Sequence, residues 1–557
     1  NLDFLFKNGI NVDSQPCEWF DLLMPMRRKR HNSTNKLSVE DLTTWTNLKA
    51  LLDNAGEGGG VYPKFIPFTI PEIAKHLGLY MLNGISPSPQ VELKFSSQFE
   101  DPVNGNDLCN EVFKGKEGIR RHREFKTFFA AVDPRYVTPP RQTHPNWKVD
   151  PVLKHAMEVC KEVMHMGKYI SIDEQTIGFQ GRHADKIRVT YKNAGDGFQA
   201  DAICADGYTF NWYFRNQPAP QHFLNKGFSP LSSRVLCLLS QLPNKNYVCG
   251  MDNLYMSTKL SHACYTSAQK VMTHGVTRCN GRGLPKCITQ QEVTRKEDLQ
   301  RQRGTLKVAQ LVNDPACDGF LAISLYDQKP VYLLTNACNN VEWLKKERSC
   351  WHKEKGKKVN VPYYRLNVID MYNHNMNNVD IADQLRTVYR FFVWLRKRKW
   401  WWAMFFWSFE MLLTNAYVVY LKFQILHRHQ PMSHYEFHRQ VALAWLKPDE
   451  YWGKRSEKKQ RRSPRSHSSS STESIVSTSI GARRSLYIQS EDKKDTRCHR
   501  VTDISLHPFT GKLKDRLNIS KMHLPIEATK SDSRCQLHMW AAKMRFRSNI
   551  VCATCNV

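Results

Sequence analysis

Two aspartates at the start of a predicted helix carry the clearest chemical signal in the sequence. Asp380 and Asp383 lie three residues apart within VDIADQ, so on a helix they share one face. The residues that follow, LRTVYRFFVWLRKRKWWW, are basic and aromatic. Carboxylates that could hold a divalent metal therefore stand directly before residues that could contact phosphate and stack on bases.

Two further aspartates lie far upstream, each beside a predicted strand. Asp173 ends the predicted strand 168–172, and Asp252 follows another short apolar stretch. Phosphodiester cleavage commonly uses two divalent cations roughly 3.5–4 Å apart, and magnesium takes carboxylate oxygens as ligands. If the fold brings Asp173, Asp252, Asp380 and Asp383 together, they are ligands of the right type and number for such a site.

Each aspartate also has an ordinary structural explanation. An aspartate at a strand end is commonly a turn residue or a helix cap, which would account for Asp173 and Asp252. Asp383 could instead pair with Arg386, three residues further on. Taken one at a time, the structural explanations are favoured. Spacing alone therefore leaves a metal-dependent nuclease as one hypothesis among others.

The composition indicates a large protein with a polyanionic partner. A chain of 557 residues can form two to four domains and at least one large core. Lys and Arg number 81 against 52 Asp and Glu, for a formal net charge of +29. An excess of this size favours nucleic acid over an acidic membrane surface. The 16 cysteines are mostly scattered singly, which is typical of reduced thiols in the cytosol or nucleus.

One stretch has the length and apolarity of a membrane span. It covers residues 400–420, carries Glu410 in its middle, and is basic on both flanks. A charged side chain inside a bilayer is costly, and flanks of the same sign give no topology signal. We therefore expect a buried helix and no membrane. A membrane-surface protein that binds through this helix is the weaker alternative.

The remaining pattern predicts an α+β, multidomain chain. The sequence begins without Met or a secretory pattern, so we expect it to start inside a longer chain. Residues 1–30 are expected to be a disordered lead-in. A helical block follows, with helix caps at Ser38 and Thr69. Strands then alternate with helices over 167–274, which suits a mixed sheet with helices on its faces, and Asp206-Gly207 predicts a hairpin turn.

The chain ends with two paired ligand motifs. Cys535 and His538 form a C-x₂-H pair, Cys552 and Cys555 form a C-x₂-C pair, and thirteen residues lie between the two pairs. Four ligands at this spacing match a tetrahedral structural zinc site. The preceding residues are rich in charge and serine, which predicts a disordered linker. Its basic run is either a nuclear localisation signal or a solvated tail.

Four sequence blocks resemble those of the piggyBac transposase family. DEQTIGFQGR at 173–182 is similar to its DE-x-M-x-x-F-x-G-R block, and MDNLYMS at 251–257 is similar to its MDNFYTS block. RGLP at 282–285 resembles its RRGLP signature, and YNHNMNNVDIADQ at 372–384 resembles its YN…GGVDxxDQ block. The blocks occur in the family's order across roughly residues 20–450. Asn377-Asn378 replaces the family's paired glycines, and because asparagine tolerates a left-handed backbone we expect the same turn.

The resemblance implies an RNase H-like catalytic core, interrupted by an insertion domain and flanked by helical dimerisation and DNA-binding segments. It implies a DDD-type cut-and-paste transposase in which Asp173, Asp252 and Asp380 are catalytic and Asp383 is a fourth functional aspartate. Such an enzyme uses Mg²⁺ (or Mn²⁺), cuts double-stranded DNA at terminal inverted repeats, forms hairpin ends and inserts at TTAA. It acts as a homodimer in the nucleus, and its cysteine-rich end binds Zn²⁺ and contacts the transposon end. A domesticated, DNA-binding relative without transposition activity is the alternative.

Together these patterns divide the chain into segments with distinct expected roles. The boundaries are a lead-in at 1–30, helical DNA-binding and dimerisation segments at 31–166 and 390–452, catalytic core segments at 167–274 and 366–389, an insertion at 275–365, a linker at 453–530 and a zinc module at 531–557.

Overall fold

The computed structural model divides into two compact units, residues 1–462 and 463–557. The residues it describes are 1–27, 37–54, 62–87, 115–188, 196–289, 304–312, 314, 319–353, 356–391, 399–450, 525–527 and 550–552.

The second unit is described only as a short strand pair, β12 (Pro525–Glu527) with β13 (Ile550–Cys552). Cys552 is described there as backbone alone, and the other predicted zinc ligands, Cys535, His538 and Cys555, lie outside the described residues. The basic run at 454–465 also lies outside them.

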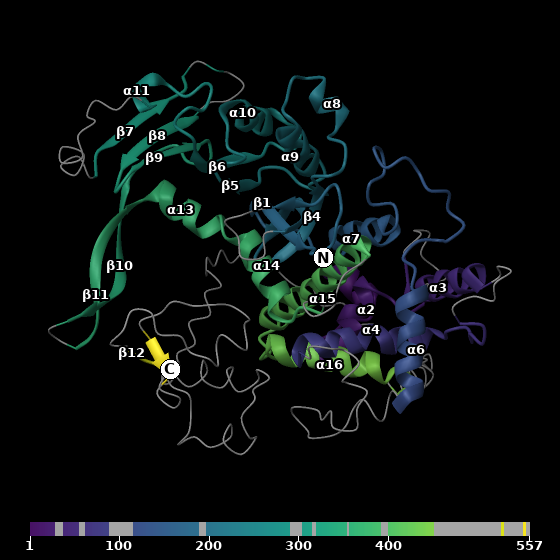
Figure 1. Cartoon of the computed structure of the whole chain (residues 1–557). Coiled ribbons are helices and arrows are strands. Elements are labelled where there is room, and N and C mark those ends of the chain that lie inside the picture. The colour runs from purple at the N-terminus through teal and green to yellow at the C-terminus, as the bar shows by residue number, and fades with distance from the viewer. Residues whose placement is uncertain are drawn as a thin grey trace, which may run out of the picture. The chain divides into compact units, whose positions relative to one another are not determined.

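A mixed sheet organises the first unit (Figure 1). Its strands run in the order β2-β3-β1-β5-β6-β9-β8-β7. β4 also pairs with β3, along the edge of β3 that faces away from β1. β1 is antiparallel to β3 but parallel to β5, and β5 is parallel to β6. The strand bounds are β1 (Tyr169–Gly178), β2 (Ile187–Arg188), β3 (Asp196–Ala205), β4 (Tyr208–Phe214), β5 (Val248–Met251), β6 (Met272–Thr277), β7 (Leu306–Gln310), β8 (Leu321–Tyr326) and β9 (Pro330–Thr335).

The predicted strands at 198–204 and 208–214 and the hairpin turn between them are confirmed, and the predicted strand that leads into Asp173 is longer than expected. Asp206 and Gly207 have φ of 50° and 80°, the two positive angles that a type I′ hairpin turn requires. The prediction that Asp173 ends its strand is wrong, because β1 continues to Gly178. Gln175 beyond it is buried and the pairing with β3 runs on. Asp173 therefore lies in the middle of a strand.

Three strands of the predicted insertion, 275–365, belong to the central sheet. β7, β8 and β9 extend the same sheet through the antiparallel pairing of β6 with β9. By contrast, among the strands that the structure describes, β10 (Trp343–His352) and β11 (Lys357–Leu366) pair with each other alone, as an antiparallel ribbon (Figure 1). β11 leads directly into α13 (Asn367–Asn375), and α13 is followed by α14 (Asn378–Val388).

A helical region packs around one central apolar helix, α15 (Trp400–Leu426). The other helices are α1 (Leu2–Lys7), α2 (Pro16–Leu23), α3 (Val39–Asn54), α4 (Ile70–Ile85), α6 (Gly115–Phe128), α7 (Asp150–Val163), α8 (Gln221–Leu224), α9 (Pro230–Ser240), α10 (Thr258–Thr266), α11 (Lys286–Thr289) and α16 (His434–Leu446).

α15 contacts α2, α7 and β4. The rings of Trp212 on β4 and Trp407 on α15 meet edge to face at 5.2 Å. Of the described helices, α15 alone is long and apolar enough to cross a membrane, and nearly all of it is buried within the fold. The predicted buried helix is therefore confirmed.

The N-terminal residues are ordered, contrary to the prediction of a disordered lead-in. α2 buries Trp19, Phe20 and Leu23 completely. The ring centres of Trp19 and Tyr420 of α15 are 5.8 Å apart, and those of Phe20 and Phe409 are 5.4 Å apart. The apolar residues of this short segment are thus part of the main core. Their partners lie some 400 residues later in the chain, so the segment's own sequence does not reveal them.

The predicted helix caps at Ser38 and Thr69 are confirmed. The Ser38 backbone N–H donates to Asp41 at 2.8 Å, and the Glu72 N–H donates to the Thr69 hydroxyl at 3.3 Å. Both caps therefore satisfy backbone groups that the helices leave without intrahelical partners.

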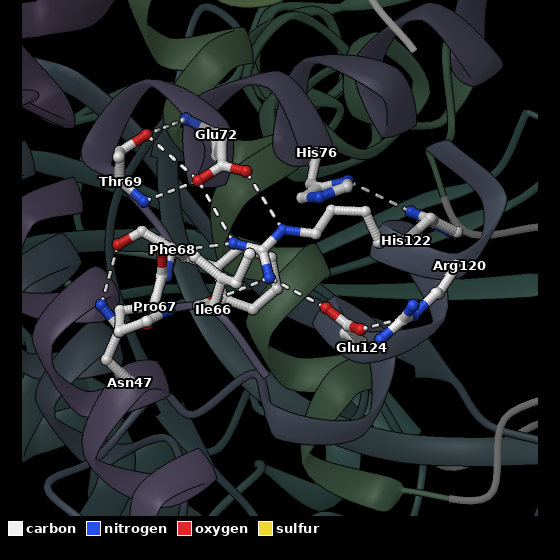
Figure 2. Close-up of polar contacts among 11 residues, drawn as sticks. Asn47, Ile66, Pro67, Phe68, Thr69, Glu72, His76, Arg120, His122 and Glu124 are labelled. Atoms are coloured by element: carbon white, nitrogen blue, oxygen red, sulfur yellow. Dashed lines mark hydrogen bonds and ion pairs between the residues drawn. The ribbon is translucent and has the colours of Figure 1, made fainter. Parts of the chain in front are cut away.

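An arginine clamp joins α4 to α6 (Figure 2). The Arg121 guanidinium donates to Glu72 on α4 at 3.1 Å and to Glu124 on α6 at 2.8 Å. It also lies 3.8 Å from the centre of the Phe68 ring. Burial alone would raise the pKa of Glu72, but hydrogen bonds from Arg121 and Thr69 hold that pKa below its ordinary value. The clamp therefore keeps the Glu72 carboxylate charged.

Candidate active site

The sheet places two of the predicted aspartates side by side. In the parallel pairing of β1 with β5, Ile172 lies opposite Met251. Asp173 is the next residue on β1 and Asp252 is the residue that follows β5. Two positions about eighty residues apart in the chain therefore meet at the carboxyl end of the β1–β5 pairing.

Three carboxylates gather at this point. Asp173, Glu174 and Asp252 can each offer one oxygen so that all three oxygens lie within 4.8 Å of one another. The Asp173 carboxylate accepts a hydrogen bond from the Glu174 backbone N–H at 2.8 Å. The Asp252 carboxylate accepts one from the Leu254 N–H, also at 2.8 Å. These backbone contacts hold the two aspartates in place where the β1–β5 pairing ends.

The electrostatics of the cluster favour a bound cation. Burial, followed by the neighbouring Glu174 and Asp252, raises the pKa of Asp173 from 3.8 to about 8. Burial, followed by Glu174, also raises the pKa of Asp252. Carboxylates this close repel one another unless a proton or a cation lies between them. The donor set, all oxygen and partly buried, fits Mg²⁺ or Mn²⁺.

Glu174 was not among the residues predicted from the sequence. Successive residues of a strand point to opposite faces, so Glu174 would be expected to point away from Asp173. Only its position directly after Asp173, in the DE pair of the resembling block, could have indicated it. Its carboxylate is nevertheless the third member of the described cluster.

A buried ionic network supports the turn that carries Asp252. Asp201 is completely buried and lies opposite Glu174 on β3. It accepts hydrogen bonds from Arg215 at 2.8 Å, Arg234 at 2.7 Å and the Tyr255 hydroxyl at 2.9 Å. Tyr255 is three residues beyond Asp252, so this network anchors the turn beside the carboxylates. Nothing in the spacing of these residues predicted their association.

α13 lies over the ends of the central strands. The side chain of Asn375 contacts His274 of β6 at 3.2 Å, and a Cβ at Gly250 of β5 would meet that of Asn375 at 3.4 Å. Burial, followed by the charges of Asp252 and Asp173, raises the pKa of Tyr372 to about 12. Tyr372, in the resembling YN block, therefore stands near the carboxylate cluster, although its role was not predicted.

α14 holds the other two predicted aspartates, as expected, near its start. α14 contacts β1 and β3. The Asn378 side chain accepts a hydrogen bond from the Asp206 N–H at 3.0 Å and donates to the Asn375 carbonyl at 2.9 Å. Neither Asn377 nor Asn378 has a positive φ, so the expected left-handed turn is absent. Asn378 instead ties α14 to α13 and to the β3–β4 turn through its amide group.

The structure does not bring Asp380 and Asp383 into the described cluster. Asp380 is an exposed residue in the first turn of α14. Asp383 accepts an ion-pair hydrogen bond at 2.5 Å from Arg386, the helix-spaced partner considered in the sequence. Arg386 is buried and also donates to Glu410 of α15 at 3.1 Å. Asp383 is thus part of a buried ion-pair network that joins α14 to α15.

The raised pKa of Asp173 gives a test of metal binding. The proton stabilises the folded, metal-free protein below about pH 4, and this contribution is lost as the pH rises through about 8. We expect Mg²⁺ or Mn²⁺ to raise the melting temperature more at pH 8 than at pH 5. Cation at about a hundred times its dissociation constant stabilises by about 2.7 kcal/mol.

The matched control for this measurement is Asp173→Asn, which should lose most of the metal-induced rise at pH 8. An equal rise at both pH values, or a full rise in the variant, would place the cation elsewhere.

Comparisons with known proteins agree with the fold. Residues 38–417 match the family model described as Transposase IS4. The structure is also similar to that of piggyBac transposase in a synaptic complex with hairpin DNA. That match has a TM-score of 0.60 and 17% sequence identity, and it covers 80% of this chain and 82% of that chain.

The fold is therefore that of a DNA transposase, a mixed α+β protein with a cluster of acidic residues at the edge of its central strands. This chain belongs to the transposase IS4 family. The piggyBac-type resemblance predicted from the four sequence blocks is confirmed.

Proposed function

We propose that this protein is a cut-and-paste DNA transposase of the piggyBac type. The observation that carries the proposal is the meeting of Asp173 and Asp252 at one edge of the β1–β5 pair, together with Glu174. The strand order β4-β3-β1-β5-β6, antiparallel in its first half and parallel in its second, supports an RNase H-like core. Both aspartates stand at the positions that the resemblance assigns to catalysis.

The carboxylate cluster supports a metal-dependent, DDD-type mechanism. Divalent cations held there would activate the attacking hydroxyl and stabilise the leaving oxygen of the phosphodiester. Asp173 would supply an oxygen ligand from within β1, and Asp252 would supply one from the position directly after β5. The Asp201 network keeps the 252–255 turn fixed while DNA binds. Tyr372 bounds the cluster on the α13 side and keeps its phenol protonated near neutral pH.

Asp380 completes the proposed set of catalytic aspartates. It stands in the first turn of α14, which contacts β1, and α14 follows directly on the helix that carries Tyr372. Asp383, bound to Arg386, has a structural position instead. We assign cleavage to Asp173, Asp252 and Asp380, and we assign to Asp383 the positioning of α14.

The roles of the two α14 aspartates can be separated experimentally. Asp380→Asn should lower DNA strand cleavage by at least about a hundredfold, because loss even of an outer-shell metal partner typically costs 10–100-fold. Its melting temperature should match that of the wild type. Asp383→Asn leaves the buried Arg386 with Glu410 alone, so it should lower the melting temperature and reduce cleavage less than tenfold. The reverse pattern would show that Asp383 is the third catalytic aspartate.

The finer features of the family belong to the same proposal. These are cleavage at terminal inverted repeats, hairpin ends, insertion at TTAA, action as a nuclear homodimer, and Zn²⁺ held by Cys535, His538, Cys552 and Cys555. The net charge of +29 supports a double-stranded DNA partner. The test is excision from a plasmid on which the element is flanked by TTAA. Precise excision requires an active transposase, whereas binding of the ends without cleavage would favour a domesticated protein.

A further inference from the structure

The β10–β11 ribbon presents aromatic rings and lysines together on one face. Trp343, Lys345 and Trp351 occupy alternate positions of β10 and therefore share a face. Tyr364 lies directly opposite Lys345, and Lys358 lies directly opposite Trp351. We call the face that holds these five residues the outer face. It contains two ring-and-lysine patches, one at the α13 end of the ribbon and one at its tip.

The rings of the outer face are open to solvent. The exposed fraction is 45% for Trp343, 62% for Trp351 and 66% for Tyr364, and both lysines are exposed. Large exposed rings that cluster on one face usually mark an interaction site. The two tryptophans lie eight residues apart, about 27 Å along an extended strand. The outer face is therefore long enough to contact several successive nucleotides.

The opposite face of the ribbon is tied to the rest of the fold. Lys346 and Arg365 form ion pairs with Asp370 of α13, at 2.9 and 3.4 Å. The guanidinium groups of Arg348 and Arg365 lie 5.7 and 5.2 Å from the centre of the Tyr363 ring. The two ion pairs with Asp370 anchor the inner face of the ribbon to α13, and the two ring contacts hold its inner residues to one another. The outer face is left exposed for a partner.

The charge of the ribbon selects a polyanion. Its two strands contain a single acidic residue, Glu347, against six basic residues: Lys345, Lys346, Arg348, Lys357, Lys358 and Arg365. On the outer face, Lys345 and Lys358 stand with Glu347, which occupies an alternate position of β10 between Lys345 and Trp351. Lysines can neutralise phosphates, and aromatic rings stack on bases whose faces are uncovered. In a duplex those faces are covered by neighbouring base pairs. The combination of rings with lysines therefore favours DNA that has unpaired bases over intact duplex.

The ribbon is connected to the carboxylate cluster by one short helix. Leu366, the last residue of β11, is the N-cap of α13. Tyr372, which stands near Asp173 and Asp252, is six residues further, about 9 Å along a helix. A strand lying on the α13 end of the outer face can therefore continue to the carboxylates.

We propose that the outer face of the β10–β11 ribbon is a stacking platform for unpaired bases of the DNA strand that enters the carboxylate cluster. The assignment rests on the proposed function for the identity of the DNA, and it adds a site and a substrate feature to it. Strand separation beside the cut then leaves bases that Trp351, Tyr364 and Trp343 can hold, while Lys345 and Lys358 contact the backbone.

The test compares binding of one labelled oligonucleotide, single-stranded and as duplex, by the full chain in fluorescence anisotropy. Loss of a stacked ring weakens single-strand binding by about 5- to 150-fold. The variant with Trp351→Ala and Tyr364→Ala should therefore lose at least about 25-fold on the single strand and less than threefold on the duplex. Trp351→Phe with Tyr364→Phe, which keeps the rings, should restore most of the single-strand affinity.

Two matched controls complete the test. Phe6→Ala removes a ring that is 52% exposed but lies outside both the ribbon and the predicted DNA-binding segments, and it should bind both DNA forms as the wild type does. Lys345→Gln with Lys358→Gln should weaken both forms and lower the salt slope on the single strand by about 1.4, or about 0.7 for each phosphate contact.

The outcomes that overturn the platform differ from those that overturn the proposed function. Unchanged single-strand binding in the Trp351→Ala, Tyr364→Ala variant, or an equal loss on duplex, overturns the platform, even if this variant still cuts DNA. A wild-type protein that binds single strands through the ribbon but cuts no DNA with Mg²⁺ overturns the proposed function and leaves the platform as a DNA-binding surface.

Discussion

Asp173→Asn is expected to lower metal-dependent DNA cleavage by at least about a hundredfold. Asp173 lies at the centre of the cluster, within reach of both Glu174 and Asp252, and its carboxylate would be a direct metal ligand. Outer-shell partners typically account for 10–100-fold in activity or metal affinity, so a direct ligand should account for more. The assay is single-turnover cleavage of transposon-end DNA with Mg²⁺.

DNA binding gives the control for this variant. Removing one negative charge beside the DNA should leave binding unchanged or slightly stronger, since no phosphate contact is lost. A variant that cuts at more than a tenth of the wild-type rate would contradict a catalytic role for Asp173. A variant that loses binding as well would indicate a folding defect, which its melting temperature would reveal.

Arg386→Met is expected to lower the free energy of unfolding by about 3–5 kcal/mol. Arg386 is buried between Asp383 and Glu410, and Glu410 also accepts a hydrogen bond from the Phe391 backbone N–H at 2.8 Å. Removal of the guanidinium takes away the cation that is hydrogen-bonded to the buried Glu410 carboxylate, which is the costly way to break a buried ion pair. The measurement is urea unfolding at neutral pH.

An exposed ion pair offers the control for Arg386. Lys49 and Asp53 form a helix-spaced pair with side chains that are 33% and 42% exposed, and Lys49→Met should cost less than about 1 kcal/mol. The double variant Arg386→Met with Glu410→Met should recover part of the lost stability, because no buried charge then lacks a partner. A loss below 1 kcal/mol for Arg386→Met alone would show that the network is not structural.

Local patterns made much of the fold predictable. The Asp206-Gly207 turn between two strand-like stretches predicted the β3–β4 hairpin. Thr69 as a cap, with Pro71 in the first turn, predicted the start of α4, and the apolar run around Glu410 predicted a buried helix. Each of these signals depends on neighbours within a few residues. Asp252 after a strand and Asp380 in a first helical turn were predictable for the same reason.

The features of the fold and the site that the sequence did not predict depend on contacts between distant segments. The 1–30 segment looked disordered because its partners for Trp19 and Phe20 lie on α15. The strands β7 to β9 looked like a separate unit because their pairing to β6 cannot be read from their own pattern. Within the site, Glu174 was missed because strand alternation places it away from Asp173. Asp201 was missed because its three partners come from separate elements.

The most direct test of the account is cleavage of a TTAA-flanked transposon end by the purified protein. The account predicts strand breaks at the element's boundary when Mg²⁺ or Mn²⁺ is present, and none when the cation is removed by a chelator. Cleavage that persists without a divalent cation would contradict it, as would binding of the end without any cleavage when Mg²⁺ is supplied.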